Sequence, residues 1–375
     1  MSGEQQAFLC VADITGYTGY LNDSELEHAQ GTLTDLLELL VDRAGPPMRI
    51  SKLEGDAVFS YAFEDAFTDG RTFLDLVEGT YVEFRRAIDS MVLNNTCQCN
   101  ACANVSSLDL KFVIHFGSFI VQRIEKYDEL LGPDVNLVHR LLKNTVTDRL
   151  GLRAYCMYTQ PAWERLGLHE VTSLVEHDED IPDFGLVSTY VQDLGEVYHL
   201  TDRPDITLDD SQLILTQEAD VPMSPAVVWD YYSSPVFRNI LIGAEKVEIT
   251  DRVGGRVGVG TVYQCYHGSR VTPQKILQWE PFTKVVTEDS FPKPMKGSGL
   301  VVTHLEETPS GTHITRRWGA LRGPLWMRAL FPIAMIFIRR MATQTFDDFI
   351  EAISADHMQK ASSPNATSES KAAAS

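Results

Sequence analysis

Basic residues are scarce in this sequence relative to acidic ones. The chain contains 32 Lys and Arg against 52 Asp and Glu, so its formal net charge is −20. A surface with this charge repels the phosphodiester backbone of nucleic acids and the head groups of anionic lipids. The balance therefore excludes general nucleic-acid binding. A phosphorylated ligand has to arrive with a divalent cation or meet a locally basic pocket.

Long hydrophobic runs are also missing. The most apolar stretch covers only the fourteen residues from Leu325 to Ile338, and it contains Arg328 and Pro332. A helix that spans a bilayer needs about 20 residues, so we expect a buried or amphipathic helix there and no transmembrane segment. The N-terminal residues MSGEQQAFLCVADITG have no basic stretch and only a short apolar run. This pattern argues against a signal peptide and predicts a cytoplasmic protein.

Disulfide-rich and glycine-loop patterns are absent too. Six cysteines in 375 residues do not make a disulfide scaffold, and a cytoplasmic location would keep them reduced. The stretch VGGRVGVGT lacks the Gly-Lys-Ser/Thr ending of a P-loop and does not stand between a strand and a helix. We interpret its glycines as turn and bulge residues, not as a phosphate-binding loop.

The length of the chain and its 44% hydrophobic residues allow two domains, each with a core. A polar, proline-containing stretch, LTDRPDITLDD, interrupts the chain after residue 200. We therefore predict a first domain at 1–203, a linker at 204–210 and a second domain at 211–356. The polar, small-residue segment 357–375 is expected to be disordered.

The first domain is predicted to alternate strands and helices. An apolar strand ends at Asp13, a long helix follows, and MRISKL and AVFSYAF form a hairpin around Gly55. A second long helix precedes a strand pair that turns at Gly117, and the helix DVNLVHRLLKN and a late strand GEVYHL complete the order. This order predicts an α+β fold in which an antiparallel sheet carries its helices on one face.

Two strand ends of this domain each carry an aspartate beside a turn. Asp13 lies in CVADITGYTGYL and Asp56 in SKLEGDAVFSYA, and LGPDVNLVHRLLKN places Asn136 and Arg140 on one helix face. The motifs ADITGYT, KLEGDAVF and LGPDVNLVHRLLKN resemble those of class III nucleotide cyclases in order and spacing. They are most similar to an uncharacterised bacterial cyclase-like family that has DISGYT, EGDAVF and HRLLKN. The resemblance covers about residues 5–200 and implies a ferredoxin-like class III cyclase domain.

The resemblance implies an enzyme that needs Mg²⁺ or Mn²⁺ and converts a nucleoside triphosphate, ATP above all, to the 3′,5′-cyclic monophosphate and pyrophosphate. Such a reaction needs positioning and charge neutralisation, which two divalent cations supply. By resemblance Asp13, Asp56 and the Ile14 carbonyl bind the metal, and the helix start at Thr15 and Gly16 offers amide donors to phosphate. Alternatively, Asp13 caps a helix and Asp56 is a hairpin-turn residue.

Further nucleotide contacts follow from the same resemblance. Lys52, in KLEGDAVF, stands where adenylate cyclases place a lysine for the base, with Asp128 or Glu129 as its companion. Asn136 would orient the ribose, and Arg140 would neutralise charge on the α-phosphate in the transition state. The family combines residues of two subunits in each site, which implies a homodimer. Alternatively, Lys52 is an ordinary exposed strand residue and Arg140 a surface ion-pair partner.

Two positions depart from the cyclase pattern. Active cyclases usually carry a phosphate-binding lysine just before the late strand, where this chain has Leu194. Glu54 adds a carboxylate close to Asp56, which either joins the metal site or repels triphosphate. These departures leave two alternatives open, a cyclase for pyrimidine nucleotides and a catalytically retired nucleotide-binding module.

The stretch CQCNAC places three thiols, of Cys97, Cys99 and Cys102, within six residues. Thiolates at such spacing can bind Zn²⁺, but a tetrahedral site needs a fourth ligand, and His115 or a group of the partner subunit is a candidate. The alternative is free buried or redox-responsive thiols. The sequence leaves both interpretations open.

Residues 211–356 resemble the START-like superfamily, also called polyketide cyclase or SRPBCC type. The resemblance is one of topology: a strand, the helix start at VPMSPAVVWDYYSSP, several strands and a long helix from about 324 to 354. It implies a helix-grip fold with an apolar cavity for a lipid or another hydrophobic ligand. Candidate lining residues are Trp279, Trp318, Trp326 and Met335. No nucleophile and base stand out, so we expect binding or sensing.

Overall fold

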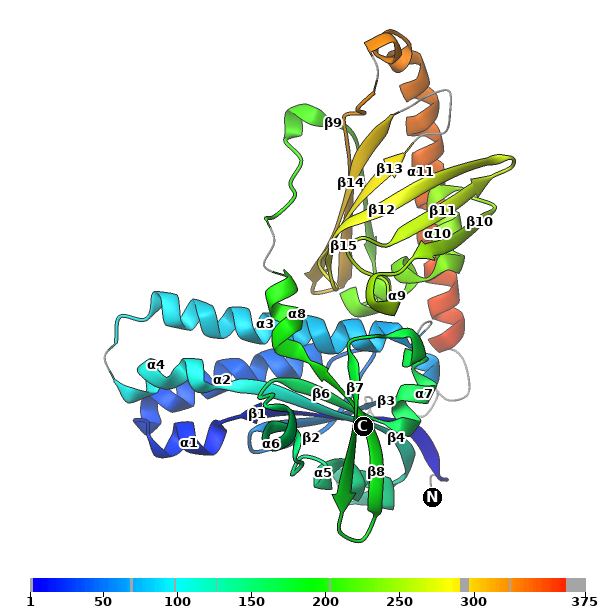
Figure 1. Cartoon of the computed structure of the whole chain (residues 1–375). Helices are drawn as coiled ribbons and strands as arrows, with labels where there is room; N and C mark the ends of the chain where they lie inside the picture. The colour runs from blue at the N-terminus through cyan, green and yellow to red at the C-terminus, as the bar shows by residue number, and fades with distance from the viewer. Residues whose placement is uncertain are drawn as a thin grey trace. The chain divides into compact units, whose positions relative to one another are not determined.

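The computed structural model describes residues 3–67, 70–97, 99–125, 127–201, 204–290, 297–323 and 325–361. The chain forms two compact units, Met1–Arg203 and Pro204–Ser375 (Figure 1). Each unit contains one sheet and its own helices, so the α+β class expected from the sequence is confirmed.

The first unit is built on a mixed sheet with the strand order β2-β3-β1-β4-β6-β8-β7, and β5 pairs with an extension of β4. Only β4 and β6 run parallel. The strands are β1 Gln5–Thr15, β2 Arg49–Glu54, β3 Ala57–Ala62, β4 Asp109–Ile124, β5 Tyr127–Leu131, β6 Tyr155–Thr159, β7 Leu174–Ile181 and β8 Gly185–Asp193. The expected hairpin is confirmed as β2 and β3, with Gly55 in the left-handed conformation that the tight turn requires.

Helices cover both faces of this sheet, not one face as expected. Central strand β1 is apolar on both sides: Leu9 and Val11 join the core that includes Val138 of α5, whereas Cys10 faces α2 and α3. In Figure 1 these helices lie on opposite sides of the strands. A continuous apolar run such as FLCVA is typical of a strand buried on both faces, and this signal was available in the sequence.

The helices of the first unit follow the apolar periodicity of the sequence where they are long. α2 buries Ala29, Leu33, Leu36 and Leu40 along one face. The helices are α1 Tyr17–Asn22, α2 Leu26–Arg43, α3 Arg71–Asn94, α4 Asn100–Asn104, α5 Pro133–Arg140, α6 Val146–Leu150, α7 Gln160–Arg165 and α8 Leu194–Thr201.

Two local predictions in this unit are wrong. Strand β4 continues through Gly117, because the glycine makes room for a neighbour and not for a turn: a Cβ there would lie 2.5 Å from Asp134. The segment expected as a late strand is helix α8. Its start is capped by Asp193, whose carboxylate accepts a hydrogen bond from the backbone N–H of Glu196 at 3.2 Å.

The second unit contains a seven-stranded antiparallel sheet in the order β10-β11-β12-β13-β14-β15-β9. The several strands and the long final helix expected there are confirmed, although the helix continues past residue 354 to Ala361. The elements are β9 Leu213–Val221, α9 Pro225–Ser233, α10 Pro235–Ile242, β10 Lys246–Asp251, β11 Val262–His267, β12 Arg270–Glu280, β13 Lys284–Ser290, β14 Ser298–Thr308, β15 Gly311–Gly319 and α11 Leu325–Ala361. Residues 362–375 of the expected tail lie outside the described residues.

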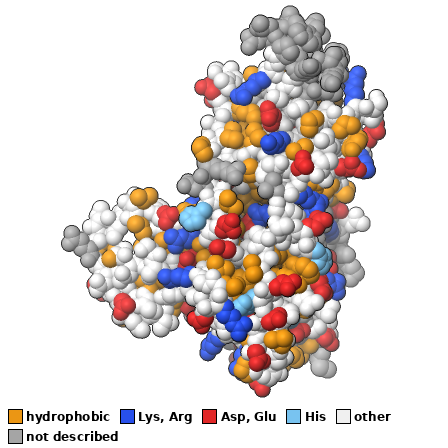
Figure 2. Space-filling model, in the orientation of Figure 1, with side chains coloured by type: hydrophobic (Ala, Val, Ile, Leu, Met, Phe, Trp, Pro, Cys, Tyr) orange, Lys and Arg blue, Asp and Glu red, His pale blue; other side chains and the backbone are white. Residues whose placement is uncertain are grey.

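Helix α11 packs on the sheet through a stripe of buried side chains at helical spacing, Ala342, Phe346, Phe349 and Ile353. Within the described residues, no helix is long and apolar enough to cross a membrane. Acidic, basic and hydrophobic side chains are interspersed over the molecular face in Figure 2.

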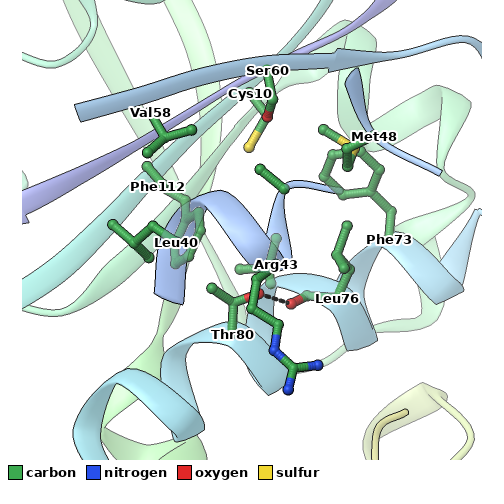
Figure 3. Close-up of a pocket in the computed structure, with 13 residues that line it drawn as sticks. Cys10, Leu40, Arg43, Met48, Val58, Ser60, Phe73, Leu76, Thr80 and Phe112 are labelled. Carbon is green, nitrogen blue, oxygen red and sulfur yellow. Dashed lines mark hydrogen bonds between the residues drawn. The ribbon is translucent and has the colours of Figure 1, made fainter. Parts of the chain in front are cut away.

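A small pocket of the first unit lies between the sheet and helices α2 and α3 (Figure 3). Its lining is mainly apolar and includes Cys10, Leu40 and Phe112, and the hydroxyl of Thr80 is bonded to the Leu76 carbonyl. The volume is about 30 Å³, enough for roughly two water molecules. Burial raises the pKa of Cys10 to about 12, so this thiol is inert. We interpret the pocket as a packing gap, because it is too small for a nucleotide.

Candidate active site

The sheet brings Asp13 and Asp56 together. Asp13 lies opposite Ala57 in the antiparallel ladder of β1 and β3, and the N–H of Ile14 donates to the Asp56 carbonyl at 3.2 Å. Burial and the nearby charge of Asp13 raise the pKa of Asp56 above its usual value. Two carboxylates from neighbouring strand ends thus share one half-buried place, and their repulsion favours a cation between them.

A lysine that the sequence analysis did not identify lies at the same place. Lys111 lies opposite Asp13 on β4, and its ammonium is 3.0 Å from the Asp13 carboxylate. The ammonium also donates to the Leu142 carbonyl at 3.2 Å. Both charged side chains are largely buried, 18% and 16% exposed. The register between β1 and β4 puts Lys111 here, and no local pattern in the sequence reveals that register.

Asn144 and Tyr155 extend this polar site. The Tyr155 hydroxyl donates to the Asn144 side-chain oxygen at 2.9 Å, and that oxygen also accepts from the backbone N–H of Val146. Burial, with the charge of Asp13, raises the pKa of Tyr155 to about 12. Tyr155 therefore stays protonated at neutral pH and holds the segment that supplies the Leu142 carbonyl.

Thr15 and Gly16 form the turn that follows Asp13. Gly16 is left-handed with φ 88°, and it precedes the six-residue helix α1. A Cβ at Gly16 would lie 3.0 Å from the Ser107 carbonyl, so glycine suits this turn on two grounds. The Thr15 hydroxyl donates to the Arg153 carbonyl at 3.3 Å. The turn is therefore fixed to the rest of the unit, beside the two aspartates.

The Glu54 carboxylate pairs with Lys52 and His139. It lies 2.8 Å from the Lys52 ammonium and 3.1 Å from Nδ1 of His139 on α5. Lys52 is exposed, whereas His139 is half-buried with its ring edge-on to Phe59. Burial lowers the pKa of His139 despite the nearby carboxylate. Glu54 thus fixes the hairpin to α5 and holds Lys52 on the hairpin surface.

The other predicted nucleotide contacts are exposed. Asn136 and Arg140 lie on the solvent-facing side of α5, and Arg140 forms no ion pair with any described residue. Asp128 and Glu129 are exposed on β5, where Asp128 is 3.8 Å from Arg123. Within one chain, no recorded bond joins these four side chains to Asp13 or Asp56.

Leu194 is fully buried at the start of α8. An apolar side chain in that position cannot contact a triphosphate. The described cation that does lie beside the aspartates is Lys111, whose ammonium is 3.0 Å from the Asp13 carboxylate.

The donor set at Asp13 and Asp56 fits a hard divalent cation. Mg²⁺ prefers carboxylate and carbonyl oxygens, and the two carboxylates with the backbone of Ile14 offer such oxygens in one place. Lys111 competes for the Asp13 carboxylate, so a bound cation has to share or replace that ion pair.

Cys97, Cys99 and Cys102 lie together with a residue that the sequence analysis missed, His28 of α2. His115, the fourth ligand considered from the sequence, is elsewhere: it is buried, its Nδ1 is 2.8 Å from the Thr159 hydroxyl, and its Nε2 is 3.4 Å from the Asp134 carboxylate.

In the second unit, Trp279 is buried and packs on Trp229 with ring centroids 4.4 Å apart. Trp318 is partly buried, and its indole N–H donates to Gln217 at 2.7 Å. Trp326 and Met335 lie outside the residues whose side chains the structure describes.

The sequence has recognisable relatives of unassigned function. A model of a protein family of unknown function, DUF2652, matches residues 33–149. The uncharacterized protein Rv2561/Rv2562 of Mycobacterium tuberculosis is 36% identical over 117 residues, which are 30% of this chain and 52% of the relative. The chain thus spans about half the length of the curated relative that it matches.

Solved structures that are similar to this chain include nucleotide cyclases. A bacterial light-regulated adenylyl cyclase aligns over 53% of this chain and 57% of its own, with 12% identity and a TM-score of 0.40. The guanylyl cyclase Cya2 aligns over 51% and 92%, with 13% identity and a TM-score of 0.37. The adenylyl cyclase CyaB from P. aeruginosa aligns over 51% and 96%, with 15% identity and a TM-score of 0.35. At these values the similarity decides neither the fold nor the activity of this chain.

Proposed function

We propose that the chain is a nucleotide cyclase that forms a 3′,5′-cyclic monophosphate and pyrophosphate from a nucleoside triphosphate, with ATP as the preferred substrate. The observation that carries the proposal is the juxtaposition of Asp13 and Asp56 at two neighbouring strand ends. Each aspartate belongs to a sequence motif that resembles a metal-site motif of class III cyclases.

The proposed roles follow the chemistry of the reaction. The ribose 3′ oxygen attacks the α-phosphorus and gives its proton to water, while the bond from the α-phosphorus to the bridging oxygen breaks and pyrophosphate leaves. Asp13, Asp56 and the Ile14 carbonyl would hold Mg²⁺ or Mn²⁺, which when bound supplies charge neutralisation for the triphosphate. Lys111 holds the Asp13 carboxylate in place before a cation binds.

A second copy of the chain would complete the site. Asn136 and Arg140 are exposed on α5, and no ion pair within the described part of the chain engages the Arg140 guanidinium. Two copies arranged head to tail would let this helix face reach the aspartates of the partner subunit, where Asn136 orients the ribose and Arg140 stabilises charge on the α-phosphate.

The preference for ATP rests on Lys52. Its ammonium is exposed on the hairpin and held by Glu54, and it can donate to a ring nitrogen of adenine, with Asp128 or Glu129 accepting from the exocyclic amine. The same lysine can donate to a pyrimidine carbonyl, so a pyrimidine cyclase is the variant of this function that the experiment has to test.

The experiment incubates the purified chain with ATP, GTP, CTP or UTP and Mg²⁺ or Mn²⁺, and separates the products by chromatography. We expect cyclic AMP and pyrophosphate from the wild type. Asp13→Asn and Asp56→Asn should each lower the rate about a hundredfold or more. Asp35→Asn, at an exposed position of α2, is the matched control and should keep wild-type turnover. Wild-type rates in both site variants would overturn the proposal.

A second candidate function is a nucleotide-binding module without turnover. Two observations favour it: the Lys111 ammonium occupies the Asp13 carboxylate, and Leu194 replaces a phosphate-binding lysine with a buried apolar side chain. This function predicts that calorimetry detects nucleotide binding while no cyclic product forms with any of the four triphosphates and either metal.

For the second unit we propose binding of a hydrophobic small molecule or lipid that regulates the first unit. The sheet of seven strands with a long helix across it supports this proposal, as does the aromatic cluster of Trp229, Trp279 and Phe282. A ligand that binds only the folded unit raises its free energy of unfolding. The increase is about 2.7 kcal/mol when the free ligand concentration is a hundred times the dissociation constant.

A further inference from the structure

Four potential metal ligands converge at one end of the first unit. The side-chain nitrogen of His28 and the sulfurs of Cys97, Cys99 and Cys102 all lie within 4.8 Å of one another. His28 belongs to the first turns of α2, whereas the cysteines lie in the connection from α3 to α4 and on α4 itself. Residues about seventy positions apart in the sequence are therefore brought to one point.

The separations suit a tetrahedral zinc ion. Zinc binds thiolates at about 2.3 Å and imidazole at about 2.0 Å, which places neighbouring ligand atoms roughly 3.5 to 3.8 Å apart in a tetrahedron. Nδ1 of His28 is 3.1 Å from the Cys99 sulfur and 3.6 Å from the Cys97 sulfur. Small side-chain rotations would bring the four atoms to the distances of a bound ion.

Backbone groups already support these sulfurs. The N–H of Cys99 donates to the Cys97 sulfur and the N–H of Cys102 donates to the Cys99 sulfur, each at 3.4 Å. The Glu25 carboxylate accepts from the N–H of Ala101 at 3.1 Å and fixes the start of α4 to the start of α2. Such outer contacts orient metal ligands, and here they are made by elements that pack against each other.

We propose that His28, Cys97, Cys99 and Cys102 bind one zinc ion in a closed, structural site. Three thiolates and one imidazole are a ligand set that favours zinc over the hard cations of the aspartate site. All four positions are filled by side chains, so no position remains for a substrate. The ion would tie α2 to the segment that leads into β4, the strand that carries Lys111.

Metal analysis and Co²⁺ spectroscopy test this site without reference to activity. The full chain, purified without chelator and under reducing conditions, should contain about one zinc ion per chain. Co²⁺ in its place should give the visible absorption of a tetrahedral thiolate complex. His28→Ala should lose most of the metal, whereas His28→Cys should retain it, because a fourth thiolate restores the ligand set.

The matched controls are His199→Asn, at an exposed histidine of α8, and Cys265→Ser, at a buried free cysteine of the second unit. Both should keep the wild-type metal content. A metal-free reduced chain that gives no Co²⁺ spectrum would overturn the proposal. So would a disulfide between any two of the three cysteines as the main form of a chain purified in parallel without reductant.

A different observation carries a second inference, in the second unit. Arg316 on β15 is 1% exposed, and neither its Nε nor its Nη1 has a hydrogen-bond partner among the residues that the structure describes. Its guanidinium lies over the Trp318 ring at 4.7 Å, and burial lowers its pKa. A buried cation with unpaired donors is destabilising unless something pairs with it.

Polar side chains surround Arg316 in the interior of the second unit. Arg316 lies opposite Gln217 of β9, whose amide donates to the Ala342 carbonyl of α11, so this face of the sheet faces that helix. Thr303 and the second buried arginine, Arg238, lie in the same interior. Arg238 differs from Arg316 because its guanidinium is bonded to Gln274. The interior beside Arg316 is therefore polar as well as apolar.

We infer that the ligand of the second unit carries an anionic group, such as a carboxylate, that pairs with Arg316. This inference rests on the hydrophobic-ligand function proposed above. A guanidinium donates charge-assisted hydrogen bonds to a carboxylate. The Nε and Nη1 donors of Arg316 point to different sides of its guanidinium, and we expect the carboxylate to accept from one of the two. The apolar remainder of the ligand would lie against the aromatic side chains of the interior.

Thermal-shift titrations of the full chain with dodecanoate and with dodecanol test the inference. We expect dodecanoate to bind at least tenfold more tightly than dodecanol. Arg316→Met should remove that preference and keep dodecanol binding, whereas Arg317→Met, at the neighbouring and more exposed arginine, should leave the preference intact. Equal binding of both probes to the wild type would overturn the anionic-group inference alone. Binding of neither would overturn the hydrophobic-ligand function on which it rests.

Discussion

At the scale of single residues, Asp13 and Asp56 are far apart in the sequence but lie together in the structure, and the charged side chain of Lys111 lies beside them. Asp13 and Asp56 were found from their motifs because each motif is local and continuous. Lys111 and Tyr155 could not be found in this way, because the register of β4 against β1 and β6 brings them there. Asn144 ends the motif LGPDVNLVHRLLKN, but the motif does not show its contact with Tyr155. Long-range pairing is the information that a single sequence lacks.

The same limit applies to the cysteine cluster. Three cysteines within six residues are visible in the sequence, but His28 is one of ten histidines and lies on a different helix. The packing of α2 against α4 brings His28 close to the three cysteines, and this contact is not visible in the sequence. His115 was a plausible ligand by residue type, and its burial beside Asp134 and Thr159 removes it from consideration.

Glycine is needed at position 117 because a neighbouring side chain approaches closely, and not because the chain turns there. A Cβ at Gly117 would lie 2.5 Å from the Asp134 side chain, whose carboxylate accepts the N–H of Ser118 at 2.6 Å. We expect Gly117→Ala to destabilise the chain by about 1 to 3 kcal/mol, because the added methyl group displaces Asp134 and the start of α5. Urea unfolding measures the loss.

A double variant tests whether the loss of stability comes from the contact with Asp134 or from a general destabilisation of strand β4. Gly117→Ala combined with Asp134→Ala should lose less stability than the sum of the single variants, because the smaller side chain leaves room for the methyl group. Additive losses would show that Gly117 is needed for a reason other than its approach to Asp134.

Asp134 itself should make stability depend on pH. The contact with His115 and the Ser118 N–H lower its pKa below the usual value. A depressed pKa in the folded state contributes stability above the usual value of about 3.9, and that stability disappears as the pH falls through the folded pKa. We expect Asp134→Asn to lower the free energy of unfolding by about 1 kcal/mol at pH 7. The difference from wild type should shrink as the pH falls below about 3.9, and a constant difference would exclude an electrostatic cause.

At the scale of elements, the long periodic helices and most strands could be predicted, and the errors have local reasons. GEVYHL alternates like a strand, but Asp193 and Glu196 are a helix-start pair, and Tyr198 of α8 packs towards α3, where its hydroxyl donates to Asp89 at 2.6 Å. Tertiary packing decides such short, ambiguous segments. The sequence predicts strand β1. Its apolar residues on both faces also indicate helices on both sides of the sheet, where the order of elements alone predicts helices on one side.

Helix α5 has one buried face and one exposed face. Val135, Leu137 and Val138 are buried in the core, whereas Asn136 and Arg140 are exposed. We expect Val138→Ala to cost about 1 to 2.5 kcal/mol of stability. Arg140→Ala should change stability by no more than about 0.5 kcal/mol and lower cyclase turnover about a hundredfold or more. A loss of stability in Arg140→Ala would mean that this residue is structural in the assembled protein.

At the scale of the whole molecule, the dimer that the cyclase resemblance implies can be tested directly. Within the described part of one chain, Asn136 and Arg140 form no hydrogen bond or ion pair with Asp13 or Asp56 and are exposed on α5. Mixing an Asp56→Ala chain with an Arg140→Ala chain should restore activity. When subunits exchange freely, half of the dimers combine one chain of each kind, and one of their two sites keeps all its groups. The mixture should therefore reach roughly a quarter of wild-type turnover.

The control for this experiment is a mixture of Asn136→Ala with Arg140→Ala. Both changes lie on the same helix face, so each site of the mixed dimer receives one damaged α5 and the mixture stays inactive. Tagged subunits show in both cases whether mixed dimers form. Recovery in the first mixture alone requires that the aspartates of one subunit work with Asn136 and Arg140 of the other. Mixed dimers that stay inactive in both cases would place the whole site within a single chain, and the exposed α5 face would then need another explanation.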